Sequence, residues 1–244
     1  MKEKHIENVS VDKDKKKAKK KNAPITVKAN KKGKHVMPLL NVLRVLIIPF
    51  YYLVKPFKYF GNRKVKDGAC VYVSNHYGLF DPIYVAATTW EGVHFISKRQ
   101  TFEAPILGFF MRKVKAIKVN RDGNDVRAML DSFKCLNNGE KICIYPEGTR
   151  NKENDEIREF RHGAAVMAIK AKAPIVPVVM YTRPKLFRCT HILIGEPFEL
   201  SEYYDKKLTE EEYTSADEKI RNVLLTIRAQ HTEWLKNKKK RKTH

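Results

Sequence analysis

Two short segments of this chain carry residue types that could activate a hydroxyl group and bind a phosphate. Segment 75–81 (NHYGLFD) follows an apolar run and holds a histidine and an aspartate, His76 and Asp81, separated by four residues. Segment 145–150 (YPEGTR) follows another apolar run and holds a carboxylate, a glycine, a hydroxyl and a guanidinium. A histidine with a carboxylate is a candidate general base, and an arginine can bind two phosphate oxygens at once.

The spacing of His76 and Asp81 allows two interpretations. In the first, the turn folds back so that Asp81 hydrogen-bonds one ring nitrogen of His76 and leaves the other nitrogen free to act as a base. In the second, Asp81 only caps a helix that begins at Pro82, and His76 is an ordinary loop histidine, because aspartate is favoured at N-caps and proline in the first turn. The residue types leave both open.

The second segment is a candidate anion site. Gly148 would let backbone N–H groups approach an anion, and Thr149 and Arg150 add side-chain donors. Glu147 could hydrogen-bond a substrate or fix Arg150. The alternative is an ordinary polar turn after a strand. Arg121 follows a further strand-like run and carries little information by itself.

The elements that would position these residues alternate along the chain from residue 68 onward. Short β-branched runs predict strands at 69–74, 94–97, 116–119, 141–145, 174–181 and 191–194. Helical patterns cover 81–90, 104–112, 123–136, 161–171 and 209–236, the last opened by Thr209 as N-cap. The alternation predicts an α/β fold in which a mostly parallel or mixed central sheet is flanked by helices. Both polar segments then lie at the carboxyl ends of strands, where such sheets bind ligands.

An apolar segment precedes this region. Segment 36–54 (VMPLLNVLRVLIIPFYYLV) is interrupted by Arg44 and Pro49, and lysines flank it on both sides. A charge in mid-membrane costs roughly 2.5–3.5 kcal/mol, and basic flanks on both sides conflict with the positive-inside bias. We therefore expect a bent interfacial or re-entrant helical anchor on one leaflet. A single span and a helix buried against the domain are the alternatives.

Composition divides the chain into four parts. We expect a disordered Lys-rich tail at 1–34, a membrane-associating helical segment at 35–62, a folded domain at 63–236 and a basic tail at 237–244. The aromatic residues at 50–60 suit the membrane–water interface.

The formal charge of the chain is +22, and most of it lies in the two ends. Residues 1–34 hold 13 lysines and 4 acidic residues, a net +9, and the run 236–242 adds +6. Such charge favours an anionic partner, namely an anionic membrane surface, phosphorylated substrates or nucleic acid; a solvated tail without a partner is the alternative. The folded part shows no aromatic RNA-binding signature, so we expect no specific nucleic acid.

The four cysteines are scattered, with no Cys-x-x-Cys pair and no histidine at zinc-finger spacing. This pattern predicts reduced thiols and no metal site.

Four blocks of the sequence, taken together, resemble the glycerolipid acyltransferase family and in particular its 1-acyl-sn-glycerol-3-phosphate acyltransferases. The blocks are 75–81, 116–121, 145–150 and 173–178. Their order is highly specific, and the resemblance covers roughly residues 69–200. One departure is Lys115, which stands before the second block where glycine is usual.

The resemblance implies transfer of an acyl group from a thioester, acyl-CoA or acyl-carrier protein, to the sn-2 hydroxyl of lysophosphatidic acid. His76 would take the hydroxyl proton, and Asp81 would orient His76. Neither a metal or redox cofactor nor a covalent acyl-enzyme is implied. Glycerol-3-phosphate or another lysophospholipid is the alternative acceptor, and a basic membrane- or RNA-binding protein without catalysis is the alternative of another class.

The resemblance also assigns the acceptor's phosphate to Arg121 and Arg150, with Gly148 and Thr149; Glu147 would either hydrogen-bond the acceptor or fix Arg150. The acceptor and product are membrane lipids, whereas the acyl donor is soluble. We therefore expect a monotopic or re-entrant enzyme at the cytoplasmic face of a membrane, held additionally by its Lys-rich tails.

Overall fold

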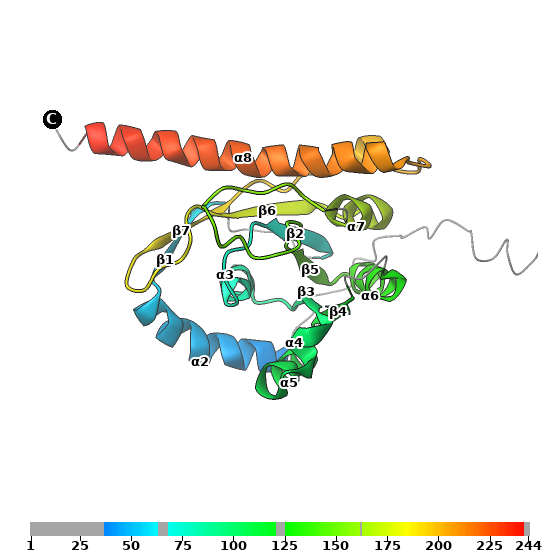
Figure 1. Ribbon diagram of the computed structural model, residues 1–244, viewed down its shortest axis with the longest axis horizontal. Helices are drawn as coiled ribbons and strands as arrows, with labels where there is room; N and C mark the ends of the chain where they lie inside the picture. Colours follow the sequence, from blue (N-terminus) through cyan, green and yellow to red (C-terminus); the bar gives the residue numbers. More distant parts are fainter. Residues whose placement is uncertain (1–36, 63–67, 121–124, 162, 242–244) are drawn as a thin grey trace, which may run out of the picture.

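A mixed sheet forms the centre of the molecule (Figure 1). Within residues 37–62, 68–120, 125–161 and 163–241, which the computed structural model describes, seven strands pair in the order β1-β7-β6-β2-β5-β3-β4. Their bounds are Phe57–Gly61 (β1), Cys70–Ser74 (β2), Val93–Lys98 (β3), Ile117–Val119 (β4), Lys141–Ile144 (β5), Ile175–Met180 (β6) and Thr190–Ile194 (β7). The five strands from β6 to β4 are parallel, whereas β7 is antiparallel to β6 and β1 is parallel to β7.

Helices cover both faces of this sheet (Figure 1). Their bounds are Pro38–Val54 (α2), Asp81–Ala86 (α3), Arg99–Glu103 (α4), Pro105–Lys113 (α5), Val126–Asn137 (α6), Ala164–Ala171 (α7) and Glu210–Lys240 (α8), with a 3₁₀ turn at Ser201–Tyr203. One core cluster joins α6, α7 and α8 to the sheet, and a second joins α2 and α3 to the opposite face. The central strand β2 shows the alternation, because Val71 and Val73 enter the first cluster while Cys70 and Tyr72 enter the second.

The α/β architecture predicted from the sequence is confirmed, and the strands and helices predicted from residue 68 onward are present in the described part of the chain. Helix α8 begins at the predicted cap: Thr209 Oγ1 accepts from the Glu212 N–H, and the Glu212 carboxylate accepts from the Thr209 N–H. This reciprocal capping box satisfies two of the free donors at the helix start. The helix continues to Lys240, into the segment expected to be a basic tail.

The segment 57–61 differs from its expected place in a helical anchor. It forms β1, which pairs along its whole length with β7, more than 130 residues later. Of the aromatic residues that suggested a membrane interface, those on β1 instead pack against the domain: Phe57 is 8% exposed, and Tyr59 donates its hydroxyl to the Tyr84 carbonyl at 2.6 Å. A strand stabilised by so distant a partner has little local signal. The expected domain start at residue 63, the tail 1–34 and Arg121 lie outside the described residues.

Helix α2 is fixed to the domain through a buried arginine. Arg44 donates from Nε to the Ala86 carbonyl at 2.8 Å, from Nη1 to Trp90 at 3.0 Å and from Nη2 to Glu91 at 2.7 Å. These carbonyls lie at and after the end of α3, where a helix leaves carbonyl groups without partners. Burial lowers the pKa of Arg44 to about 10, so the guanidinium stays charged at neutral pH. The residue that makes 36–54 a poor bilayer span is therefore the one that attaches α2 to the protein.

We predict that Arg44→Leu releases α2 while the sheet stays folded. Loss of the guanidinium leaves buried carbonyls without a donor, and one hydrogen bond to a charged group contributes about 1.5–3 kcal/mol. Hydrogen exchange in detergent should show faster exchange of the α2 amides, and urea unfolding should show a loss of at least this size. The control is Arg99→Leu, because the Arg99–Glu103 pair is 60% exposed on both sides and such pairs contribute little. Unchanged α2 protection in Arg44→Leu would contradict the attachment.

Candidate active site

The structure brings His76 and Asp81 together as the first interpretation of their spacing requires. His76 follows β2, Asp81 is the first residue of α3, and Nδ1 of the histidine lies 2.8 Å from Oδ2 of the aspartate. Because a carboxylate only accepts, Nδ1 carries the proton and Nε2 presents its lone pair. Among the described residues, Nε2 makes no hydrogen bond, and the His76 side chain is 18% exposed. This is the arrangement of a base that is oriented on one side and reachable on the other.

Asp81 holds the whole turn as well as the ring. Its Oδ2 also accepts from the backbone N–H groups of Tyr77 at 2.6 Å and Gly78 at 2.7 Å. The side chain is 2% exposed. The N-cap of α3 is Phe80, so Asp81 is the first residue inside the helix. Its carboxylate accepts from the N–H groups of the turn before the helix, which is not what an ordinary N-cap does. The helix-cap interpretation therefore does not account for Asp81.

Tyr145, directly after β5, forms one wall beside the histidine. Its ring stacks on the His76 ring with centroids 4.2 Å apart and planes 22° apart. Since β2 and β5 are parallel neighbours, their carboxyl ends lie side by side, and the two polar segments meet there. The stack and the Asp81 hydrogen bond together fix the ring in two directions.

Glu147 lies behind the histidine as a buried acid. It is 4% exposed, and its Oε1 accepts from the His76 backbone N–H at 3.1 Å. Burial raises the pKa of the Glu147 carboxyl to about 7, against the opposing effects of that N–H and of the Arg158 charge. Its other oxygen, Oε2, is buried without a hydrogen-bond partner among the described residues. Glu147 thus ties the second segment to the backbone of the first.

The rest of the second segment forms a turn that needs glycine. Gly148 has φ +70°, and a Cβ there would lie 2.8 Å from Cδ of Arg161. The Arg161 side chain thus packs over Gly148, while Arg150 is exposed. Thr149 is half-buried beside them. Two guanidiniums therefore stand near the turn: Arg150, which is a candidate from the sequence, and Arg161, to which the sequence assigns no role.

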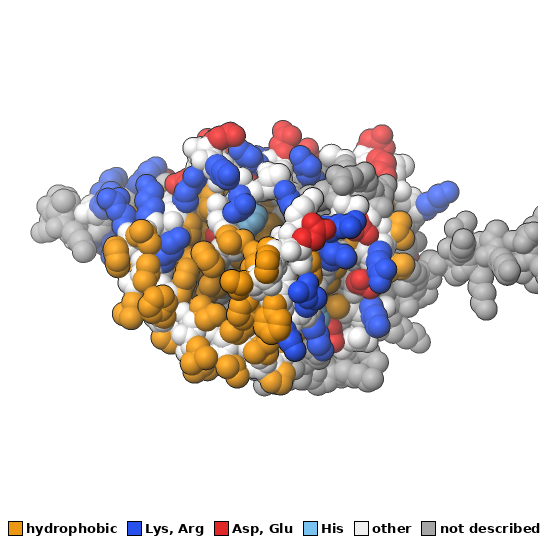
Figure 2. All heavy atoms as spheres, turned by 60° about the horizontal axis from the view of Figure 1, so that its bottom comes forward, with side chains coloured by type: hydrophobic (Ala, Val, Ile, Leu, Met, Phe, Trp, Pro, Cys, Tyr) orange, Lys and Arg blue, Asp and Glu red, His pale blue; other side chains and the backbone are white. Residues whose placement is uncertain are grey.

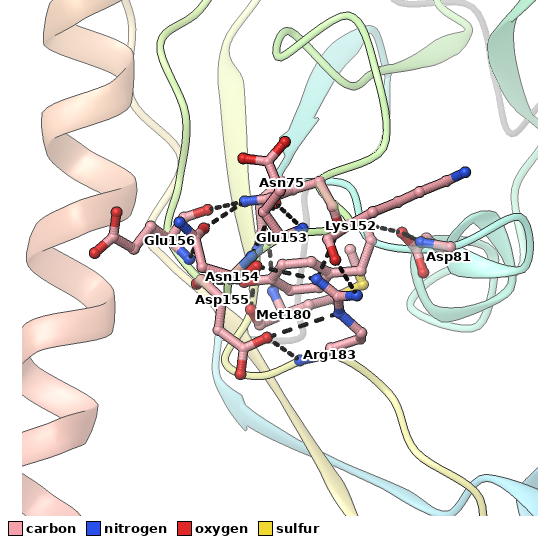
Figure 3. A network of polar contacts seen from close by, with 12 residues as sticks. Asn75, Asp81, Lys152, Glu153, Asn154, Asp155, Glu156, Met180 and Arg183 are labelled. Carbon is pink, nitrogen blue, oxygen red and sulfur yellow. Dashed lines mark hydrogen bonds and ion pairs between the residues drawn. The ribbon is translucent and has the colours of Figure 1, made fainter.

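A network of amides and carbonyls supports the segment after this turn. The Asn151 N–H donates to the His76 carbonyl at 2.7 Å. Asn75 exchanges two hydrogen bonds with the backbone of Met180, at 2.9 and 3.0 Å, and so extends the pairing of β2 with β6. Figure 3 shows Arg183 reaching into the loop that follows, where it donates to the carbonyls of residues 151, 152 and 154. The loop 151–154 is therefore held by residues that follow two strands, β2 and β6.

Sequence reasoning missed three of these residues. Tyr145 stood inside a selected block, and only the fold shows that its ring meets His76. Arg161 lies in the segment 160–163 and Arg183 after β6, at the same sheet edge as the two polar segments. The only signal of Arg161 and Arg183 in the sequence is their position after a strand or in a loop between strands. This signal is weak, because many residues in such positions have no functional role.

The sequence of this chain is similar to sequences of known proteins. The Acyltransferase family model matches residues 57–181, more than half of the chain. A 1-acyl-sn-glycerol-3-phosphate acyltransferase of Brassica napus chloroplasts is 33% identical over 129 residues, which cover 51% of this chain and 36% of that protein. The human beta enzyme of the same name is 33% identical, in an alignment that covers 52% of this chain and 50% of the human protein. The Bacillus subtilis enzyme is 28% identical, in an alignment that covers 56% of this chain and 70% of the bacterial protein. The chain thus spans well under half of the plant relative.

Among solved structures, the 1-acyl-sn-glycerophosphate acyltransferase PlsC of Thermotoga maritima superposes with a TM-score of 0.60 at 21% identity. The superposition covers 79% of this chain and 80% of that one. At this identity the likeness shows a shared fold.

The buried acid gives a pH-dependent prediction. The pKa of Glu147 is raised on folding, so folding binds a proton between about pH 4.5 and pH 7. The protonated Glu147 carboxyl stabilises the folded state relative to the ionised one. This contribution to the free energy of unfolding is complete below about pH 4.5 and is lost as the pH rises through about 7. Glu147→Gln stays neutral throughout, so the variant should become more stable relative to wild type across this window, by on the order of 3 kcal/mol.

Urea unfolding at a series of pH values measures the difference. The exposed Glu159→Gln in the same region is the matched control and should track wild type. A pH-independent difference between Glu147→Gln and wild type would show that folding does not raise the pKa of Glu147.

Proposed function

The chain belongs to the acyltransferase family, and we propose that it transfers a fatty acyl group from an acyl thioester to the sn-2 hydroxyl of lysophosphatidic acid. The product is phosphatidic acid. The observation that carries the proposal is the His76–Asp81 hydrogen bond of 2.8 Å, with Nε2 of the histidine left reachable at the carboxyl edge of the sheet. The names of the relatives support the acceptor.

In this reaction the acceptor hydroxyl attacks the thioester carbonyl while His76 Nε2 takes its proton. Asp81 holds the ring in the required tautomer and stabilises the imidazolium that forms. When the tetrahedral intermediate collapses, the C–S bond breaks and the thiolate leaves with the proton from His76. The proposed chemistry needs neither a metal nor a redox cofactor, and the acyl group passes directly to the acceptor without a covalent acyl-enzyme.

The acceptor's phosphate fits the turn after β5. Gly148 opens the backbone, Thr149 offers a hydroxyl, and Arg150 and Arg161 supply two guanidiniums. Arg suits this role because its fork binds two phosphate oxygens. Arg121, which lies outside the described residues, remains a proposed member of this group by its place in the second sequence block. Acyl-CoA and acyl-carrier protein are the candidate donors.

Membrane attachment is proposed from a continuous apolar face. Figure 2 shows hydrophobic side chains gathered on one side of the molecule. Exposed apolar residues lie on α2, on α5, in the turn 79–80 and in the loop 186–187: Leu46, Phe50, Leu53, Ile106, Phe109, Leu79, Phe80, Leu186 and Phe187. These pieces touch, because Tyr51 of α2 lies 6.0 Å from the Phe80 ring and the Phe187 N–H bonds the Val54 carbonyl. Phe80 belongs to the turn between His76 and Asp81, so this face borders the site.

This apolar face supports attachment to one leaflet. In the part of the chain that the structure describes, no helix has the length and apolar character to cross a bilayer. Helix α2 has one side bound to the domain by Arg44 and the other side apolar and exposed. Such a helix lies in the interface, where the lipid acceptor enters and the soluble donor arrives. The lysines of residues 1–34 and 237–244 add attraction to anionic lipid.

We predict that His76→Ala lowers turnover by about 10²–10⁴-fold, because the hydroxyl loses its base. Asp81→Asn should also be severe, since the ring loses its orienting charge. The assay uses the purified full chain, lysophosphatidic acid and acyl-CoA or acyl-carrier-protein donors, with glycerol-3-phosphate and other lysophospholipids as competing acceptors.

The control is His191→Gln on β7, whose wild-type ring bonds His231 instead of a carboxylate. Its turnover should stay near wild type, and melting curves should verify that each variant is folded. Turnover of His76→Ala within a few-fold of wild type would refute the catalytic assignment. Salt-sensitive RNA binding without acyl transfer would favour the nonenzymatic alternative.

We also predict that the double variant Phe50→Asp, Leu53→Asp detaches the protein from vesicles. Both side chains are at least 70% exposed, and burying each in lipid contributes about 1.5–3 kcal/mol, so affinity should fall by roughly a hundredfold or more. Flotation with uncharged phosphatidylcholine vesicles at about 1 M salt removes the contribution of the tails, since the Debye length is then about 3 Å.

Leu130→Asp is the matched control, because Leu130 is 49% exposed on α6, away from the apolar face. It should float like wild type. Equal flotation of the double variant and wild type would exclude α2 as the lipid contact.

A further inference from the structure

A second group of reactive side chains lies at the opposite end of the strands from His76. His94 is at the start of β3, Cys135 is in the last turn of α6, and Glu140 immediately precedes β5. One ligand atom from each of the three lies within 4.8 Å of the other two. His94 is 4% exposed and the Glu140 side chain 12%. The catalytic scheme above uses none of them.

The end of α6 fixes the cysteine and the glutamate next to each other. Gly139 has φ +79°, the Glu140 N–H bonds the Cys135 carbonyl at 3.0 Å, and the Gly139 N–H bonds that of Leu136 at 3.0 Å. These two bonds around a left-handed glycine are the Schellman motif, which brings Cys135 and Glu140, five positions apart, into contact. The positions of Cys135 and Glu140 are therefore set by the backbone before any ligand binds.

The histidine is oriented from its other side. Its Nδ1 lies 2.9 Å from the Lys115 carbonyl, in a residue with φ +51°. A carbonyl only accepts, so Nδ1 carries the proton and Nε2 points its remaining position at Glu140 Oε2, 2.7 Å away. If Nε2 also carries a proton, the imidazolium donates it to the carboxylate; a metal ion that replaces this proton would bind both atoms. Metal-binding histidines have this second hydrogen bond to a backbone carbonyl.

We propose that His94, Cys135 and Glu140 form a site for Zn²⁺ or a divalent metal of the same class, with water as the fourth ligand. A nitrogen, a thiolate and a carboxylate are the donors that zinc prefers. Tetrahedral zinc ligands lie roughly 3.3–3.6 Å apart, given metal–ligand distances of about 2.0–2.3 Å. Shifts of about 1 Å bring the three atoms to this spacing.

The role of such a site is structural. The metal would join β3, α6 and the start of β5 at the amino edge of the sheet, whereas His76 and Tyr145 follow the carboxyl ends of β2 and β5. The inference is independent of the proposed acyl transfer, because it needs no substrate.

The test uses the full chain, stripped of metal with a chelator and titrated with Co²⁺. Thiolate coordination should give a near-ultraviolet charge-transfer band that Zn²⁺ displaces. Zn²⁺ at about a hundred times its Kd should raise the Tm by roughly 5–10 °C. Cys135→Ser should lose the band and the Tm rise, whereas Cys189→Ser, at an exposed free cysteine, should keep both.

Two further variants keep the proposal testable if Cys135→Ser folds poorly. His94→Gln and Glu140→Gln retain the thiol and should each weaken Co²⁺ binding at least tenfold. No charge-transfer band in the wild type, or a Zn²⁺-dependent rise in Tm that survives in Cys135→Ser, would overturn the site. The first result would leave His94 and Glu140 as a proton-bridged ion pair only.

Discussion

The geometry of the candidate site depends on one buried oxygen, Oδ2 of Asp81. It accepts from the His76 ring and from the backbone N–H groups of Tyr77 and Gly78, all within 2.8 Å. The three bonds close the turn between β2 and α3 and leave the ring no other orientation. The same turn then carries Leu79 and Phe80 outward to the apolar face. One carboxylate thus links the direction of the base to the surface from which a lipid would come, which is why its loss should affect more than the charge on His76.

The second half of the site is attached to the first through the backbone of His76. Glu147 accepts from its N–H, and Asn151 donates to its carbonyl. Because β2 and β5 are parallel neighbours, these contacts need no long loops; the strands end together and their following residues meet. The turn at Gly148, the candidate anion site, is consequently held at a fixed position relative to His76. For a two-substrate reaction this matters, since misplacement of the acceptor by about 1 Å can cost about a hundredfold in rate.

The sequence predicts well what is set by local pattern and poorly what depends on distant partners. The strands around β2 and the Thr209 capping box carry period-2 and N-cap signals, and they were found within a few residues of the predicted bounds. Strand β1 pairs with β7 across the chain, whereas the pattern of its aromatic residues alone indicates a membrane interface. Arg44 was correctly identified as unsuited to a bilayer, but only the fold shows the carbonyls that it binds. The contact between His76 and Asp81 is predictable because their spacing is short, whereas the ring of Tyr145 reaches His76 only through strand pairing.

The spacing of the cysteines along the chain likewise does not show which residues the fold brings together. Spacing along the chain excluded a zinc finger, yet His94, Cys135 and Glu140 come together through a strand, a helix end and a glycine turn rather than through a motif. The two ends of the parallel strands then have different physical characters. At the carboxyl end, hydrogen bonds hold the polar groups and leave one nitrogen of His76 reachable. At the amino end, the candidate metal ligands of His94, Cys135 and Glu140 converge beside the core. A fixed amino edge would keep β3 and β5 in register, and β5 is the strand that delivers Tyr145 and Glu147 to the site. Stability at one edge and reactivity at the other are therefore coupled through β5.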